Sequence, residues 1–261
     1  MHELTVQQLS AGYGSNIVLF NINITLATGE ILSLVGPNGS GKTTLIRCLS
    51  GVVNPTSGSI LRNSLDLSTT TSNQRAKIIA TVPQAINLPL DYTVIEIVAM
   101  GRHPHLSTWK SEQHHDYEHI FNSLEQVSLT PLAHKKISEL SGGQRQRVAI
   151  ARALSQEPEI ILLDEATAHL DLKNQAKIFY LLKQLVEEHS ISIISATHDL
   201  NLSGQFSDRI ALLAEGHIHS IGSPEEILTE DNLKQIYDID LLTFTHPTNK
   251  QPLIFFDTNL E

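Results

Sequence analysis

The residues with the strongest chemical signal form a glycine-rich loop that ends in Lys42 and Thr43, the spacing of a phosphate-binding loop. An apolar run, Ile31 to Val35, precedes the loop, and a helical pattern over residues 43–49 follows it. Glycines let successive backbone N–H groups face an anion, and the start of a helix adds its dipole. The Lys42 ammonium can reach terminal phosphates and the Thr43 hydroxyl can bind Mg²⁺. The residues expected to contact a nucleotide here are Gly36, Pro37, Asn38, Gly39, Ser40, Gly41, Lys42, Thr43 and Thr44.

Two carboxylates follow a second apolar run, Ile160 to Leu163. We expect a buried strand that delivers Asp164 to its C-terminal end, where open α/β sheets bind ligands. Asp164 would hold Mg²⁺, directly or through water, and Glu165 would position or deprotonate an attacking water molecule. An apolar strand that ends in Asp-Glu is common, so this interpretation depends on the phosphate-binding loop being present as well.

Ser141, Gly142 and Gly143 precede a stretch, Arg147 to Leu154, that is predicted to be helical. A hydroxyl and two glycines before a helix can form a second anion site, because the backbone approaches closely and helix N–H groups are available. The simpler interpretation is a capped helix start after a loop.

The segment Leu140 to Gln144, Leu-Ser-Gly-Gly-Gln, resembles the signature of the ATP-binding cassette (ABC) ATPases. The resemblance extends over nearly the whole chain and implies ATP and Mg²⁺ as ligands. It implies that Tyr13 stacks on adenine, that Gln84 contacts Mg²⁺ and the attacking water, and that His198 contacts the γ-phosphate. The resemblance assigns four residues to catalysis: Lys42, Gln84, Glu165 and His198. It assigns three to the metal: Thr43, Gln84 and Asp164. The further nucleotide contacts that it implies are Ser141, Gly142, Gly143, Gln144 and Asp171.

Two positions depart from the family pattern. Ala166 stands where the family usually has proline, and Ala168 stands where serine is frequent. Neither departure removes a group assigned to chemistry, and their effect on the loop from Ala168 to Asp171 is left open.

The elements that must position these residues indicate an α/β fold. Apolar residues alternate with polar ones over residues 4–9 and 17–26, which predicts strands, and strands are also expected at 191–196, 210–214 and 217–221. Helices are predicted at 175–188 and 203–208. With the resemblance, we expect a P-loop NTPase core (RecA-like) over residues 1–87 and 156–261, an N-terminal antiparallel β-subdomain, and an inserted α-helical subdomain over residues 88–155.

The resemblance also implies an assembly. Family members form a head-to-tail dimer that holds two ATP molecules between the phosphate-binding loop of one chain and the signature of the other, and a homodimer is expected here. The interval between Gln84 and Ser141 is too short for a long coiled-coil insertion, so a transporter subunit with separate integral membrane permease subunits is favoured.

Several segments resemble the metal-chelate importers, which serve ferric siderophores, ferric citrate, haem and cobalamin. They are residues 92–104, 222–229, 232–237 and 246–252. A periplasmic or lipid-anchored substrate-binding protein would then act indirectly. The alternatives are a cassette for another cargo, such as an exporter or a manganese or zinc importer, and a soluble regulatory ATPase.

Composition narrows the function classes. The 261 residues carry a formal net charge of −10, which argues against a nucleic-acid partner. No apolar run is long enough to cross a bilayer and no signal peptide is expected, so the predicted location is the cytoplasmic face of the inner membrane. The single cysteine, Cys48, is expected in the core. Five histidines, at 103, 105, 114, 115 and 119, match no metal-ligand spacing and are interpreted as a solvated surface.

Overall fold

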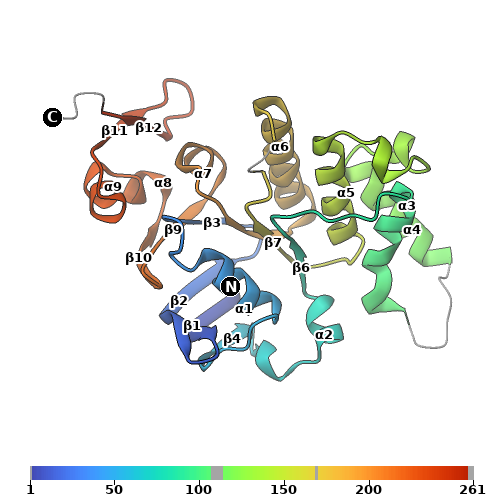
Figure 1. Cartoon of the computed structure of the whole chain (residues 1–261), viewed down its shortest axis with the longest axis horizontal. Coiled ribbons are helices and arrows are strands. Elements are labelled where there is room, and N and C mark those ends of the chain that lie inside the picture. Colours follow the sequence, from blue (N-terminus) through green and yellow to red (C-terminus); the bar gives the residue numbers. More distant parts are fainter. Residues whose placement is uncertain (1, 107–113, 168–169, 258–261) are drawn as a thin grey trace. The chain divides into compact units, whose positions relative to one another are not determined.

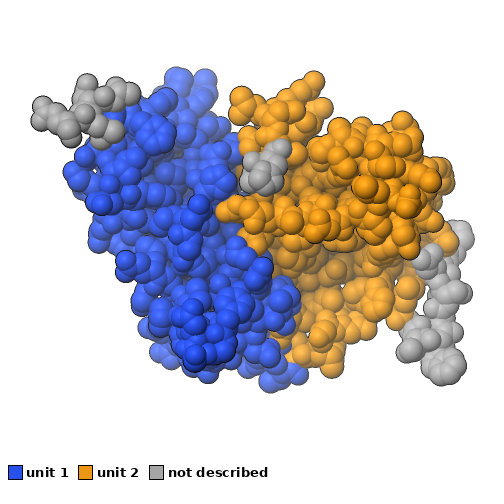
Figure 2. Space-filling model, in the orientation of Figure 1, with its two compact units in different colours: residues 1–69, 192–261 blue, residues 70–191 orange. Residues whose placement is uncertain are grey.

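The computed structural model describes residues 2–106, 114–167 and 170–257. The chain divides into two compact units, unit 1 with residues 1–69 and 192–261, and unit 2 with residues 70–191 (Figure 2). The predicted helical subdomain, residues 88–155, falls inside unit 2, and its boundaries remain a prediction. Ala168 lies outside the described residues.

Unit 1 begins with an antiparallel sheet in the order β2-β1-β4-β5. Its strands are β1 (His2–Tyr13), β2 (Asn16–Ala27), β4 (Ser57–Arg62) and β5 (Leu65–Asp66), and a 3₁₀ turn, η1 (Leu67–Thr69), follows. Along β2 the residues Leu19, Ile22, Ile24 and Leu26 are buried while most of their neighbours are not, so one face of the strand packs inward. The predicted N-terminal antiparallel β-subdomain is therefore confirmed.

The second sheet of unit 1 is built around β3 (Ile31–Val35), which pairs in parallel with β8 (Ser192–Ala196) and β9 (Arg209–Ala214). All residues of β3 and β8 are buried, as expected for parallel strands covered on both faces. β10 (His217–Gly222) forms the predicted hairpin with β9. Helix α1 (Lys42–Ser50) follows β3, and α7 (Leu200–Phe206) follows β8.

The C-terminal part of unit 1 packs against this sheet. It contains α8 (Pro224–Ile227), α9 (Glu230–Tyr237), and a hairpin of β11 (Leu241–Thr245) and β12 (Pro252–Phe256). Side chains from these elements form one buried cluster with residues of β3 and β9: Val35, Ile210, Leu212, Ile227, Leu228, Leu233, Leu241 and Ile254.

Unit 2 contains the parallel pair β6 (Ile79–Val82) and β7 (Ile160–Asp164) together with most of the helices. Three of them, α3 (Val94–Ala99), α4 (His114–Gln126) and α5 (Gly142–Leu154), lie against one another (Figure 1), and each has buried apolar residues. The other elements are α2 (Ser72–Ala76), η2 (Met100–His105), η3 (Thr130–Leu132), η4 (Ile137–Glu139) and α6 (Leu172–His189). Among the described residues, no helix is both long enough and apolar enough to span a membrane.

Three helices begin earlier than the apolar periodicity predicts. α5 begins at Gly142 instead of Arg147, α6 at Leu172 instead of Gln175, and α7 at Leu200 instead of Ser203. Each start is fixed by the preceding side chain, which accepts a hydrogen bond from the backbone N–H three residues later. The predicted starts were wrong because the capping side chain, which apolar periodicity does not register, sets the point where each helix begins.

Candidate functional site

The phosphate-binding loop joins β3 to α1 in unit 1, and its glycines are required by its geometry. Gly36, Gly39 and Gly41 have φ angles of 152°, 81° and 109°, which side-chain-bearing residues rarely adopt. A Cβ atom on Gly36 would lie 2.0 Å from the carbonyl oxygen of Leu213, and one on Gly41 would lie 2.7 Å from a methyl carbon of Leu19. The loop therefore follows a tight path that only glycine allows.

Two side chains in this loop give it the character of an anion site. The Nζ of Lys42, which is buried, donates to the carbonyl oxygens of Gly36 at 2.7 Å and Pro37 at 2.9 Å. The buried hydroxyl of Ser40 has no hydrogen-bond partner among the described residues. A buried hydroxyl without a partner is unfavourable by about 1–3 kcal/mol, and a phosphate oxygen would remove this penalty. The loop therefore fits a phosphate group.

His198 follows β8, at the same end of the sheet as the loop that follows β3. The N–H of Thr197 donates to the carbonyl oxygen of Leu34, and Asp199 caps α7 through the N–H of Leu202. His198 is exposed between these two fixed residues. Ligands of open α/β sheets bind at this end of the strands, and the predicted contact of His198 with the γ-phosphate stays a prediction.

Tyr13, at the end of β1, is the aromatic residue predicted to stack on adenine. Its side chain is largely exposed, and its hydroxyl accepts a hydrogen bond of 3.1 Å from Nη1 of Arg47 on α1. Arg47 thus links the tyrosine to the helix that begins at the phosphate-binding loop.

In unit 2, the parallel strands β6 and β7 place Gln84 beside Glu165. Val82 pairs with Leu163, so the residues after each strand lie at one edge. Nε2 of Gln84 donates to Oε2 of Glu165 over 2.7 Å. Asp164 is buried at the end of β7, and Glu165 has a left-handed φ of 46°. The structure thus brings together the two unit 2 residues predicted to act on the attacking water.

The signature segment is first of all a helix cap. Oγ of Ser141 accepts from the N–H of Gln144 at 3.3 Å, and Oε1 of Gln144 accepts from the N–H of Ser141 at 2.8 Å. Gly142 has open space around it, whereas a Cβ atom on Gly143 would lie 2.6 Å from Cγ of Asn174. The two glycines therefore differ, since Gly143 permits α5 to approach α6, whereas Gly142 is exposed at the start of α5.

Asp171 caps α6. Its Oδ1 accepts from the N–H of Asn174 at 2.8 Å, and its Oδ2 accepts from Nδ2 of the same residue at 3.0 Å. This structural role was not predicted from the sequence. Ala166 is buried after β7, and nothing in the structure explains its departure from the family pattern.

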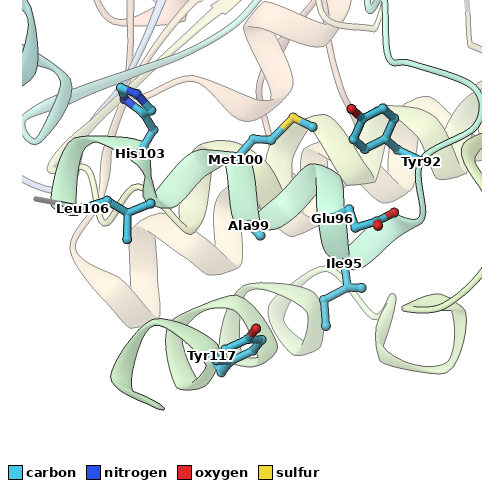
Figure 3. Close-up of a pocket in the computed structure, with 8 residues that line it drawn as sticks. All are labelled: Tyr92, Ile95, Glu96, Ala99, Met100, His103, Leu106 and Tyr117. Atoms are coloured by element: carbon cyan, nitrogen blue, oxygen red, sulfur yellow. The ribbon is translucent and has the colours of Figure 1, made fainter. Parts of the chain in front are cut away.

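Unit 2 also has a groove of about 370 Å³ along α3, η2 and α4 (Figure 3). Its lining is mostly apolar or aromatic and consists of Tyr92, Ile95, Glu96, Ala99, Met100, His103, Leu106 and Tyr117. The one carboxylate, Glu96, accepts hydrogen bonds from the hydroxyl and the N–H of Thr93, both at 2.7 Å, which lower its pKa.

The ABC transporter family model matches residues 19–168. The chain belongs to this family. The iron(3+)-hydroxamate import ATP-binding protein FhuC of Bacillus subtilis strain 168 is 37% identical to the cassette over 258 residues, which cover 98% of this chain and 96% of that protein. The cassette is thus an ATPase of the kind that powers ABC transport, as predicted.

Solved structures agree with this assignment. A metal-chelate type ABC transporter in an inward-facing conformation matches with a TM-score of 0.86 at 31% identity, covering 97% of this chain and 96% of that one. A dimeric cassette in a post-hydrolysis state with ADP and Pi matches with a TM-score of 0.71 at 31% identity, covering 84% and 98%. The predicted P-loop NTPase fold is confirmed.

The cassette also contains a buried charged cluster that the sequence analysis did not single out. The Arg102 side chain is 3% exposed, and its Nε lies 3.0 Å from Oδ1 of Asp116. Its Nη1 donates to the carbonyl oxygen of Ser155 at 2.7 Å and to Oε2 of Glu157 at 2.6 Å. Arg102 therefore ties η2 to α4 and to the turn after α5.

Proposed function

We propose that the cassette is the ATP-hydrolysing subunit of an ABC importer whose cargo is an iron(III) chelate of the siderophore class. The observation that carries this proposal is the match to an iron(3+)-hydroxamate import protein along almost the whole of both chains. The structural likeness to a metal-chelate type transporter supports it independently.

In unit 1, Gly36 to Thr44 would bind the phosphates of ATP, with Lys42 at the terminal phosphates. The unsatisfied Ser40 hydroxyl and the left-handed glycines support this role. Tyr13 would stack on adenine through its exposed ring, and His198 would contact the γ-phosphate from the end of β8.

The hydroxyl of Thr43, the carboxylate of Asp164 and the amide oxygen of Gln84 would hold Mg²⁺. All three are hard oxygen donors, which Mg²⁺ prefers. Because the Gln84 nitrogen donates to Glu165, its oxygen is the atom left for a cation. The ion would neutralise phosphate charge, and Glu165 would accept the proton of the attacking water.

The signature residues, Ser141 to Gln144, and Asp171 would serve a nucleotide held by a second copy of the chain. Ser141 and Gly142 are exposed at the start of α5, where the helix dipole favours an anion, and this supports the role. The likeness to a dimeric cassette with ADP and Pi supports the homodimer.

Separate permease subunits would hold the cassette at the cytoplasmic face of the cell membrane, with the substrate-binding protein acting indirectly. We propose that the groove of Figure 3 receives a permease element. Its apolar and aromatic lining is suited to an apolar helix face.

The test of the nucleotide mechanism is Glu165→Gln, which keeps the size of the side chain and removes the proton acceptor. We expect hydrolysis to fall by about 10²–10⁴-fold, the usual contribution of a general base, while ATP binding persists and dimers accumulate. Glu188→Gln, at an exposed position on α6, is the matched control and should hydrolyse normally. ATP turnover and light scattering measure both effects, and an ATP-bound Glu165→Gln protein that stays monomeric would contradict the sandwich.

The cargo is tested by reconstitution with metal-chelate permeases from the same genome, assayed against ferric siderophores, ferric citrate, haem and cobalamin. Uptake of an iron chelate that requires ATP and fails with Glu165→Gln supports the proposal. Uptake restricted to another cargo would refute the iron assignment and leave the ATPase mechanism intact.

A further inference from the structure

The first turns of α4 bring together two of the five histidines that the sequence pattern left as a solvated surface. His115 and His119 lie one helical turn apart, with Nε2 of one 2.8 Å from Nε2 of the other. Their rings are nearly perpendicular, at 82°. His115 is mostly exposed, whereas His119 is only 20% exposed. The side chain of His114 lies outside the described part of the chain.

The second nitrogen of each ring faces a carboxylate. Nδ1 of His119 lies 3.0 Å from Oε1 of Glu157, and Nδ1 of His115 lies 3.4 Å from Oε2 of Glu118. A carboxylate behind the imidazole favours the tautomer with the proton on Nδ1, and it is the usual outer partner of a metal-binding histidine.

With a proton on each Nδ1, both Nε2 atoms carry a lone pair, and the two lone pairs lie close together. At 2.8 Å such lone pairs repel unless a cation joins them, either a proton or a metal ion. Burial, the largest effect, lowers the pKa of His119, which disfavours the proton. The remaining charges nearby are those of Glu118, Glu157, Asp116 and Arg102, and their sum is negative.

We propose that His115 and His119 bind a divalent transition-metal ion through their Nε2 atoms. Two nitrogens about 2.0 Å from a metal and at a right angle to each other lie about 2.8 Å apart, which is the cis arrangement of square-planar or tetragonal sites. Tetrahedral Zn²⁺ would need about 3.3 Å. The observed spacing therefore favours Cu²⁺ or Ni²⁺ over Zn²⁺.

The site is an open one. Among the residues that the structure describes, no three His, Cys, Asp or Glu side chains form a metal-binding group, so water would fill the other positions. This site is separate from the residues proposed to bind ATP and Mg²⁺, and it does not depend on the proposed function.

The test is titration of the nucleotide-free full chain with Cu²⁺, Ni²⁺ and Zn²⁺, followed by calorimetry and, for Cu²⁺, by electron paramagnetic resonance. His115→Ala is the main variant because its side chain is mostly exposed and the core does not depend on it, and His119→Ala is the second. His134→Ala, at an exposed histidine outside the pair, is the matched control. The other histidines are present in every variant and can bind metal weakly, so the result is the difference in metal affinity between variants.

We expect wild type and His134→Ala to bind one Cu²⁺ or Ni²⁺ at least tenfold more tightly than His115→Ala and His119→Ala. The Cu²⁺ spectrum should show two nitrogen ligands, and the bound ion should raise the Tm only where the pair is intact. Equal affinity in wild type and His115→Ala would overturn the proposal, and tighter binding of Zn²⁺ than of Cu²⁺ would overturn the assigned geometry.

Discussion

Replacing Arg102 should cause a large and measurable loss of stability in the cassette. Its guanidinium is almost fully buried and contacts the Asp116 carboxylate, the Glu157 carboxylate and the carbonyl oxygen of Ser155. Arg102→Met keeps much of the apolar stem but removes the charge and the donors. Asp116, which is 7% exposed, then loses its cationic neighbour in a buried setting.

The size of the stability loss expected for Arg102→Met follows from this burial. Removing one partner of a buried ion pair destabilises a protein by about 3–5 kcal/mol, because a buried charge loses its compensation. For a chain of this length, 1 kcal/mol corresponds to roughly 2–4 °C in Tm, so we expect a fall of roughly 6–20 °C. Glu157 is 42% exposed and remains hydrated, so it adds little to this loss.

Thermal unfolding followed by circular dichroism measures the effect. The matched control is Lys234→Ala, which breaks the 2.6 Å ion pair with Asp240 on the surface and should leave the Tm almost unchanged. The double variant Arg102→Met with Asp116→Leu should recover part of the loss, since it removes both charges. A Tm for Arg102→Met within about 2 °C of wild type, less than 1 kcal/mol, would refute the reasoning.

Two further predictions concern single side chains. Gly143→Ala should lower the Tm by a few degrees, because the new Cβ would displace Asn174 and weaken its hydrogen bond to Asp171. Gly142→Ala is the control and should leave the Tm unchanged, because there is open space around Gly142. Equal Tm values for the two variants would argue against the close approach of α5 and α6. Burial raises the pKa of the Cys48 thiol to about 11. At pH 8 a maleimide reagent should therefore label Cys48 only after the chain unfolds. Rapid labelling of the native chain would contradict the burial of Cys48.

Much of the site could be predicted because its signals are local. The apolar run, the glycines and Lys42 lie within a few residues of one another, and the observed α1, Lys42–Ser50, differs by one residue at each end from the predicted helix. The carboxylates Asp164 and Glu165 follow directly from a buried strand. Helix starts were less predictable, since a cap such as Asp199 outweighs the apolar repeat.

Other features depend on contacts between distant segments. Arg102 is surrounded by residues 14 to 55 positions away, so its burial could not be predicted from neighbouring residues. The spacing of His115 and His119 is visible in the sequence, but the carboxylate of Glu157 behind His119 comes from the turn after α5. The capping role of Asp171 was likewise hidden, because the family resemblance pointed only to a nucleotide contact.

The left-handed backbone at Glu165 has an evolutionary consequence. For a residue other than glycine or asparagine this conformation is unfavourable by roughly 1–2 kcal/mol, so glutamate is a poor choice for stability at that turn. Glu165→Gly or Glu165→Asn would relax the backbone and remove the proposed proton acceptor. A laboratory selection for heat resistance alone would therefore favour replacement of Glu165, and thermostable descendants of this chain would tend to be inactive unless turnover were selected at the same time.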